Sequence, residues 1–270
     1  MAMRYCCNGF SGWYVSIVNP ARVKGFGQSQ LTRNKTDQAD AKRLALFAQC
    51  SELTRRQPPS LAARELRARI ERLQALQDMR QQERNRLEAL SQGITSSVKA
   101  MVEAHIDWLN RQIVAIEKDS NDHIDGNPEL KKDAELICSI PGCGAKFAAQ
   151  FLAYIGDARR FKSAKALAAF VGVTPKQRLS GTSVKGRTMI SRAGHTAARK
   201  ALYRPGLVAK RHNPVIAAMA KRLAARGMAP KAIVGASMRR LIHMIYGVLK
   251  SKTQCNAAIP MRGLAIQDGI

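Results

Sequence analysis

Apolar and polar residues recur with a helical period over much of this chain. Between Ser60 and Lys118 apolar residues appear every three or four positions, in a stretch otherwise rich in Arg, Glu and Gln. Such spacing gives an α-helix one apolar side, so the pattern predicts two long amphipathic helices around Gly93, with Ser60 as the first N-cap. The apolar positions are 66, 70, 73, 76, 87 and 90 in the first helix and 98, 101, 102, 109, 113 and 116 in the second.

The apolar stripe of these two helices is close to a heptad pattern. It suits a helical hairpin within one chain, or a coiled coil between chains. Because charged residues fill the remaining faces, a solvated helical spacer explains the pattern equally well. The sequence leaves self-association and a plain spacer open.

Shorter helices are predicted in the second half of the chain, and Pro205 predicts a kink in one of them. The acidic, turn-rich segment 119–128 precedes them and marks a domain boundary. The sequence therefore predicts a mainly α protein with a compact helical C-terminal domain. The predicted helices span residues 146–155, 163–171, 195–211, 214–226 and 230–250.

A strand followed by a helix is predicted near the start of the chain. Residues 13–18 are β-branched and aromatic and stop at a turn formed by Asn19 and Pro20, as a buried strand does. Further on, Asp37 and Asp40 fall on the same helical stripe as two apolar residues, Leu44 and Phe47. Both carboxylates are therefore predicted to face inward.

Two functions suit this acid pair. Carboxylates one helical turn apart can bind a hard cation such as Mg²⁺, which assists phosphoryl transfer. Alternatively, Asp37 is the helix N-cap and Asp40 lies in the first turn, where both stabilise the helix dipole. On the residues alone, the capping role is favoured.

The charge of the chain points to a polyanionic partner. It carries 45 Lys and Arg against 19 Asp and Glu, a formal charge of +26. From Ala158 to Gln267 there is no Asp or Glu, while 23 Lys and Arg lie in that span. An ordinary solvated surface mixes both signs, so this imbalance favours phosphate contacts with salt-sensitive affinity. Charge alone does not distinguish DNA binding from RNA binding of the ribosomal type.

The sequence also indicates the cellular compartment of the protein. No uninterrupted apolar run approaches the roughly 20 residues that span a bilayer, and the first residues lack the apolar core of a signal peptide. The six cysteines form no C-x-x-C pair, so they are predicted to be reduced and mostly buried. We expect a cytoplasmic or nucleoid protein with no membrane partner.

Two glycine-containing segments carry candidate chemistry. Residues 139–146 resemble the phosphate-gripping turn of a helix-hairpin-helix unit, although an ordinary tight turn explains them equally well. Residues 176–187 form a predicted loop with hydroxyls among four cations. Cations offset the charge that develops when a serine attacks phosphorus, so Ser180 is a candidate nucleophile, with Ser183 and Ser191 as alternatives.

Several stretches, taken together, resemble a known family. They are VSIVNPARVKGFGQSQ, NKTDQADAKRLA, SIPGCGAKFAAQFLAYIGDARRFKSAKALAAFVGVTP, LSGTSVKG, ISRAGH and ALYRPGLVAKRHNP. In this order they resemble the DEDD-type transposases of insertion sequences, which recombine DNA under the guidance of a bridge RNA. The resemblance extends from about Trp13 to Lys250.

This resemblance assigns roles that the residues alone left open. It implies a ribonuclease H-like or resolvase-like metal domain holding Mg²⁺, a helical coiled-coil segment and a C-terminal domain with a serine nucleophile. Asp37 and Asp40 match the D-x-x-D motif and become metal ligands, while Ser180 matches the start of S-G-x-S. The implied reaction is serine attack on DNA, followed by strand exchange and religation. Phosphate contacts are assigned by charge and proximity to Lys176, Arg178, Lys185, Arg187 and Arg192.

The chain departs from the family pattern near its start. Two further acids are expected before the strand at residues 13–18, but residues 1–12 contain no Asp or Glu. We therefore expect an N-terminally truncated α/β metal domain with half of its metal site missing. The chain is therefore expected to be a transposase by descent that is defective as this polypeptide, while completion of the sheet by an upstream fragment is left open.

These inferences give four predicted segments and two functional hypotheses. The chain is a transposase that uses donor DNA, target DNA and a structured guide RNA, as a homo-oligomer joined through the helical segment. The alternative is a non-catalytic protein that binds DNA or RNA. The segments are a metal-domain remnant at 1–58, a coiled-coil segment at 59–127, a helical transposase domain at 128–252 and a tail at 253–270.

Overall fold

A computed structural model shows a protein built mainly of α-helices, which confirms the predicted fold class. The chain divides into two compact units, Met1–Pro58 and Pro59–Ile270. The structure describes residues 15–30, 36–53, 55–56, 58–90, 96–180, 184–191 and 193–256.

The first unit contains two helices, α1 (Pro20–Ser29) and α2 (Asp37–Cys50). Asn19 caps α1 by accepting from the Ala21 N–H at 2.9 Å, and a proline follows at the first helical position. The two helices meet at an edge-to-face pair of rings, Phe26 and Phe47, with centroids 5.5 Å apart. The unit is thus held by aromatic packing at the far end of α2 from its acids.

The strand predicted at residues 13–18 is wrong over its described part. Residues 15–19 have no regular secondary structure, and the carbonyl of Val15 accepts a single bond from the Arg56 N–H at 2.8 Å. A β-branched run acquires strand structure only when a neighbouring strand pairs with it. Within the described part of the first unit, no such strand is present.

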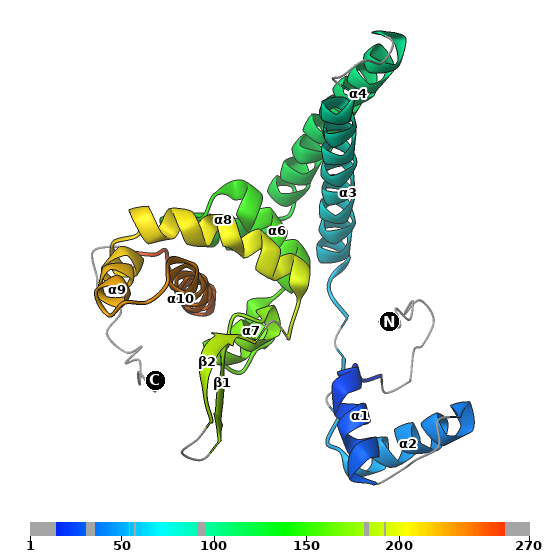
Figure 1. The fold of residues 1–270 in the computed structure, drawn as a ribbon, viewed down its shortest axis with the longest axis vertical. Helices are drawn as coiled ribbons and strands as arrows, with labels where there is room; N and C mark the ends of the chain where they lie inside the picture. The colour runs from blue at the N-terminus through cyan, green and yellow to red at the C-terminus, as the bar shows by residue number, and fades with distance from the viewer. Residues whose placement is uncertain are drawn as a thin grey trace. The chain divides into compact units, whose positions relative to one another are not determined.

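Two long helices, α3 (Leu61–Ala89) and α4 (Ser96–Asp125), lie side by side as an antiparallel hairpin (Figure 1). Ser60 caps α3 as predicted, its hydroxyl accepting from the Ala63 N–H at 3.3 Å. Apolar residues of the predicted stripes fill the seam, and the predicted pair of helices is confirmed. The buried members are Leu66, Ile70, Leu73, Leu76, Leu109 and Ile113.

Residues 119–125 are helical and not turns as their composition indicated, because α4 continues to Asp125. Ile124 is buried on this last part of α4, and Asp119 forms an ion pair with Arg69 of α3 at 2.7 Å. The ring of His123 also lies 2.9 Å from the Ala62 carbonyl. Packing on α3 therefore stabilises helix in a segment whose polar composition suggested turns.

The remaining helices form the compact C-terminal part, with a two-stranded β-ribbon between α7 and α8. The predicted helices are all present, with ends shifted by at most one residue, and Pro205 is buried within α8. The elements are α5 (Pro128–Cys138), α6 (Ala145–Ile155), η1 (Ala158–Arg160), α7 (Ala164–Val171), α8 (Thr196–His212), α9 (Pro214–Ala225) and α10 (Pro230–Ser251).

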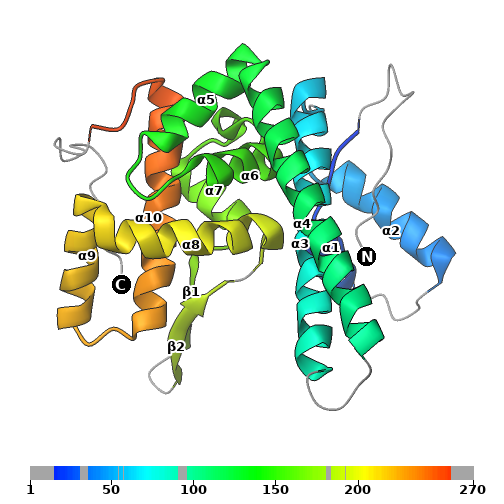
Figure 2. The ribbon, with the colours of Figure 1, turned by 90° about the horizontal axis from the view of Figure 1, so that it is seen from above.

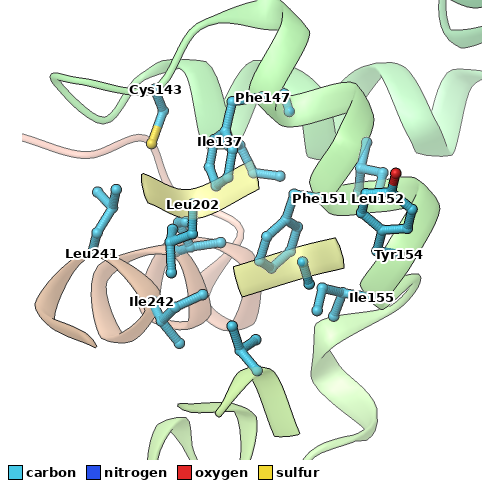
Figure 3. Packing of buried hydrophobic residues seen from close by; sticks show 14 of the residues in the cluster. Ile137, Cys143, Phe147, Phe151, Leu152, Tyr154, Ile155, Leu202, Leu241 and Ile242 are labelled. Atoms are coloured by element: carbon cyan, nitrogen blue, oxygen red, sulfur yellow. The ribbon is translucent and has the colours of Figure 1, made fainter. Parts of the chain in front are cut away.

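The core of this part lies where α6, α8 and α10 converge. Phe151 of α6 lies close to Leu202 of α8 and to Ile242 of α10 (Figure 3). The alanines and glycines of these helices allow the close approach. One example is Gly206 in α8, where a Cβ would lie 2.7 Å from the Met238 side chain. The β-ribbon and α8 therefore adjoin a closely packed core.

The glycine turn at residues 139–146 has a packing role. Gly142 has φ of +105°, and a Cβ there would lie 2.7 Å from the Cβ of Ala209 in α8. Only glycine adopts this backbone conformation without strain, and only its missing side chain allows the contact. The tight-turn explanation thus accounts for Gly142, while phosphate binding by this turn stays a prediction.

Two further expectations concern cysteines and membranes. Of the described cysteines Cys143 is buried, whereas Cys50 and Cys138 are exposed, so the expectation of mostly buried cysteines is wrong. In the described part of the chain one helix, α10, is long and apolar enough to cross a membrane. Its apolar window is 67% buried within the protein, as in a core helix.

Candidate active site and nucleic-acid interface

The segment predicted as a serine-containing loop folds as a β-ribbon. Strands β1 (Pro175–Ser180) and β2 (Val184–Ile190) pair antiparallel, with Pro175 opposite Ile190 and Ser180 opposite Val184. The ribbon projects from the helices in both views (Figure 1, Figure 2). The loop prediction is therefore wrong for these strands, and Ser180 is the last residue of β1, at the ribbon's distal end.

The ribbon also brings the predicted cations together along one narrow structure. Lys176 is exposed near the base of β1, opposite Met189. The backbones of Arg178, Lys185 and Arg187 lie farther along the same two strands. The predicted contact Arg192 and the alternative nucleophile Ser183 are outside the described residues. Four of the five predicted cations thus share the ribbon with Ser180.

The base of the ribbon is anchored to the neighbouring helices by backbone bonds. The Ser191 N–H donates to the Thr174 carbonyl at 2.8 Å, which closes the base. The His195 N–H donates to the Phe170 carbonyl at 2.7 Å, which ties the following segment to α7. At Gly194 a Cβ would lie 2.5 Å from that same carbonyl. The ribbon is therefore held firmly where it leaves the core.

His195 connects this anchor to the start of α8, a role that the sequence analysis missed. Its Nδ1 accepts from the Ala198 N–H at 3.1 Å, so the imidazole acts as the N-cap of α8. Its ring lies 5.4 Å from the ring of Tyr154 and 5.9 Å from that of Phe170. Burial lowers the pKa of His195, and Arg67 lowers it further, so the ring stays neutral as a cap acceptor must.

Asp37 and Asp40 lie at the start of α2, but not as predicted. Thr36 is the N-cap, accepting from the Ala39 N–H at 3.2 Å, so the expectation that Asp37 caps the helix is wrong. Asp37 is exposed and Leu44 is 54% exposed, so the predicted inward stripe is also wrong. The stripe is buried only at Phe47, where α2 meets α1.

The acid pair has the donor chemistry that suits a divalent cation. Its carboxylates are hard oxygen donors one helical turn apart, the ligand type that Mg²⁺ prefers. Asp40 already accepts from Arg43, with Oδ1 and Nη1 2.7 Å apart. Within the described ranges, no group of three or more His, Cys, Asp or Glu residues could hold a metal ion. The pair therefore fits Mg²⁺ in donor chemistry, with Arg43 competing for one oxygen.

A partly buried histidine on α10 lies among cations. His243 has a buried Nε2 for which the described part of the chain offers no hydrogen-bond partner. Burial, together with the smaller effects of Arg239, Arg240 and Lys165 of α7, lowers its pKa from 6.5 to about 4. The neutral ring is thus favoured in the folded state.

This environment predicts acid sensitivity of the fold. Between pH 6.5 and about pH 4, His243 is protonated in the unfolded chain but neutral in the folded chain. The free energy of unfolding therefore falls as pH falls through that window. A partly exposed ring is screened by solvent, and we expect a loss of about 1–2 kcal/mol. Denaturant titrations from pH 7 to 4 should show a shallower decline for His243→Gln. Equal declines in both proteins would contradict this assignment.

Comparison with known proteins relates both units to transposases. Residues 134–221 match the family described as Transposase IS116/IS110/IS902 family, and residues 9–95 match the DEDD transposase family of IS110. The chain is 32% identical over 237 residues to the pilin gene-inverting protein of Moraxella lacunata, which covers 87% of this chain and 72% of that protein. It is 23% identical over 211 residues to the transposase for insertion sequence element IS1111A of Coxiella burnetii, covering 65% of this chain and 56% of that protein.

The matched ranges contain the candidate residues of both units. Asp37 and Asp40 fall within residues 9–95, and Ser180 with the whole ribbon falls within residues 134–221.

Proposed function

Because the chain belongs to the IS116/IS110/IS902 transposase family, whose proteins act on DNA in transposition and recombination, we propose that it exchanges DNA strands with Ser180 as nucleophile. The observation that carries this proposal is the ribbon. It presents Ser180 at the end of a structure that also carries Lys176, Arg178, Lys185 and Arg187. Cations close to a serine offset the negative charge of the attacked phosphate.

The proposed reaction exchanges one phosphate ester for another, so the energy of the phosphodiester bond is conserved. The Oγ–P bond forms as the bond between phosphorus and one deoxyribose oxygen breaks, and the serine proton passes to that oxygen. The product is a phosphoserine ester and a free hydroxyl end. Attack by the hydroxyl of another strand reverses the step and releases Ser180. Strand exchange therefore needs no external energy source.

Asp37 and Asp40 would hold Mg²⁺, which supplies Lewis-acid polarisation of phosphate oxygens. Arg43 would then give up the Asp40 oxygen with which it pairs.

We further propose that donor DNA, target DNA and a structured guide RNA are the partners of the basic surface. A formal charge of +26, with no acid between Ala158 and Gln267, suits several polyanionic strands held at once. Affinity for each strand should fall steeply as salt rises, because binding releases condensed counterions.

The α3–α4 hairpin is the proposed site of self-association. Val98, Met101 and Trp108 of α4 are 40%, 73% and 42% exposed, and their spacing places them along one side of the helix. Apolar side chains in such a row resemble the seam of a coiled coil. A second copy of the hairpin would cover them.

A non-catalytic nucleic-acid-binding protein is the second candidate. It is favoured by one observation, that Asp40 already pairs with Arg43 at 2.7 Å. In this case the cations of the ribbon would hold DNA or RNA without cleaving it.

Strand exchange in a purified system separates the two candidates. The full chain would be mixed with Mg²⁺, donor and target DNA and their matched guide RNA, and joined strands would be measured on a denaturing gel. Recombinant strands support the transposase proposal. Salt-sensitive binding without recombinant strands supports the non-catalytic candidate.

A further inference from the structure

A cavity of about 460 Å³ lies at the base of the ribbon, where β2 meets α8 and α10. Its floor is apolar and is made by Ile190, the last residue of β2, with Val234 and Met238 of α10. Figure 2 shows these three elements converging. The volume lies within the range of roughly 300–1,000 Å³ that is typical of small-molecule sites.

The rim of this cavity is cationic and contains an exposed aromatic ring. Lys200 and Tyr203 of α8 and Lys231 of α10 line it, and both lysines are exposed. Tyr203 is 50% exposed, although it lies beside the core helix α10. Among the described residues that line the cavity there is no acid.

The shape of the cavity depends on glycine at position 235. A Cβ on Gly235 would lie 2.6 Å from Cδ1 of Ile190, so any larger residue would displace the Ile190 side chain. Arg199 forms part of the wall and is fixed by bonds to the Val171 carbonyl at 3.3 Å and the Thr196 hydroxyl at 3.4 Å. The wall is thus built on ordered elements of the core.

An apolar floor, an exposed ring and surrounding cations match the chemistry of one unpaired nucleotide. Aromatic rings stack on bases of any sequence, and cations beside them hold the flanking phosphates. The base of a duplex is already stacked and paired, so it cannot enter without leaving the helix. The cavity therefore suits a single-stranded or extruded base.

The position of the cavity relates it to the proposed nucleophile. The end of β2 is six residues from Val184, the partner of Ser180, which corresponds to about 20 Å along a strand. Stacked DNA advances about 3.4 Å per nucleotide, so this distance spans about six nucleotides.

We propose that the cavity receives one unpaired base of the DNA strand bound along the ribbon, stacked on Tyr203, with its phosphates on Lys200 and Lys231. This inference rests on the proposed function, since it places the base within about six nucleotides of the bond that Ser180 attacks. DNA is favoured over RNA because the strand along the ribbon is the one that Ser180 is proposed to attack.

Fluorescence of a DNA strand containing 2-aminopurine tests this assignment, because stacking on an aromatic ring quenches the fluorescent base. We expect the full chain to quench a single strand of 12 nucleotides and not the matching duplex. Tyr203→Ala should weaken binding about tenfold and abolish quenching, since stacking on one ring contributes a factor of this order. Tyr203→Phe should restore both, because the ring and not the hydroxyl carries the contact.

Neighbouring cations on α8 give a matched control for charge. Lys200 lines the cavity, whereas Arg204 is exposed one turn away and does not. Lys200→Ala should weaken binding several-fold more than Arg204→Ala. Equal losses, or unchanged quenching in Tyr203→Ala, would overturn the proposal. Tighter binding and stronger quenching of an RNA strand of the same sequence would overturn the choice of DNA.

Failure of this inference is distinguishable from failure of the proposed function. Ser180→Ala should leave quenching unchanged while it stops strand exchange. If Ser180→Ala retained strand exchange while Tyr203→Ala still lost quenching, the nucleophile would be wrong and the base site would stand.

Discussion

Replacement of Ser180 by alanine is expected to reduce DNA strand exchange by at least about a thousandfold, the order of loss seen when a covalent nucleophile is removed. The variant lacks the oxygen that would bond to phosphorus, whereas the ribbon cations remain. Affinity for donor and target DNA should therefore change less than about twofold, as expected for loss of one hydroxyl beside intact phosphate contacts. Exchange would be measured by gel and affinity by fluorescence anisotropy at one salt concentration.

Ser191 provides the matched control for this experiment. It lies just beyond the ribbon, where its hydroxyl accepts only a long bond of 3.4 Å from the Ala193 N–H. Ser191→Ala should therefore retain nearly full strand exchange. If Ser191→Ala lost strand exchange and Ser180→Ala retained it, Ser191 at the other end of the ribbon would be the nucleophile.

Replacement of Arg159 by alanine is expected to destabilise the C-terminal part by about 2–3 kcal/mol, below the 3–5 kcal/mol of a fully buried pair because the side chain is 30% exposed. Its guanidinium donates to both oxygens of Asp133 at 2.6 and 2.8 Å, and Nε donates to the Leu249 carbonyl at 2.9 Å. These bonds join η1, α5 and the end of α10. Denaturant unfolding would measure the loss.

An exposed ion pair gives the comparison for Arg159. Lys146 lies 2.9 Å from Glu117, but its side chain is 81% exposed, and Lys146→Ala should cost less than about 0.5 kcal/mol. Arg159→Lys should fall between the two, because lysine keeps the charge and loses the two-pronged geometry. Equal midpoints for Arg159→Ala and Lys146→Ala would show that the Arg159 contacts do not stabilise the fold.

The helices could be predicted because their ends and apolar sides are encoded locally. Ser60 caps α3 through its own hydroxyl, and Pro214 and Pro230 occupy the first positions of α9 and α10. Such signals depend on residues within one turn of each other. The predicted ends consequently agree with the structure to within one residue across α6–α10.

The incorrect predictions have a different cause, because the structure of those segments depends on residues elsewhere in the fold. The ribbon forms from residues with little strand propensity, because pairing of Ser180 with Val184 and its neighbours supplies the structure. The end of α4 is helical because Asp119 and His123 contact α3, which lies some fifty residues earlier. Local composition indicated turns in both places.

The sequence likewise predicted some residues of the candidate site and missed others. Ser180 and its cations lie close together in the sequence, so charge and motif alone predict them as candidate site residues. The cavity with Tyr203 is assembled from β2, α8 and α10, and no short motif marks it. The cap made by His195 likewise depends on its placement between Tyr154 and Phe170.

Identification of the residue joined to DNA would test the central claim most directly. The full chain would react with Mg²⁺, guide RNA and a DNA substrate carrying a nick close to the exchange point, so that the short fragment released with a free hydroxyl diffuses away and the adduct accumulates. Protease digestion and mass spectrometry would then locate the nucleotide. Our account predicts a phosphodiester on Ser180; an adduct on any other residue, or recombinant strands formed without a trapped adduct, would contradict it.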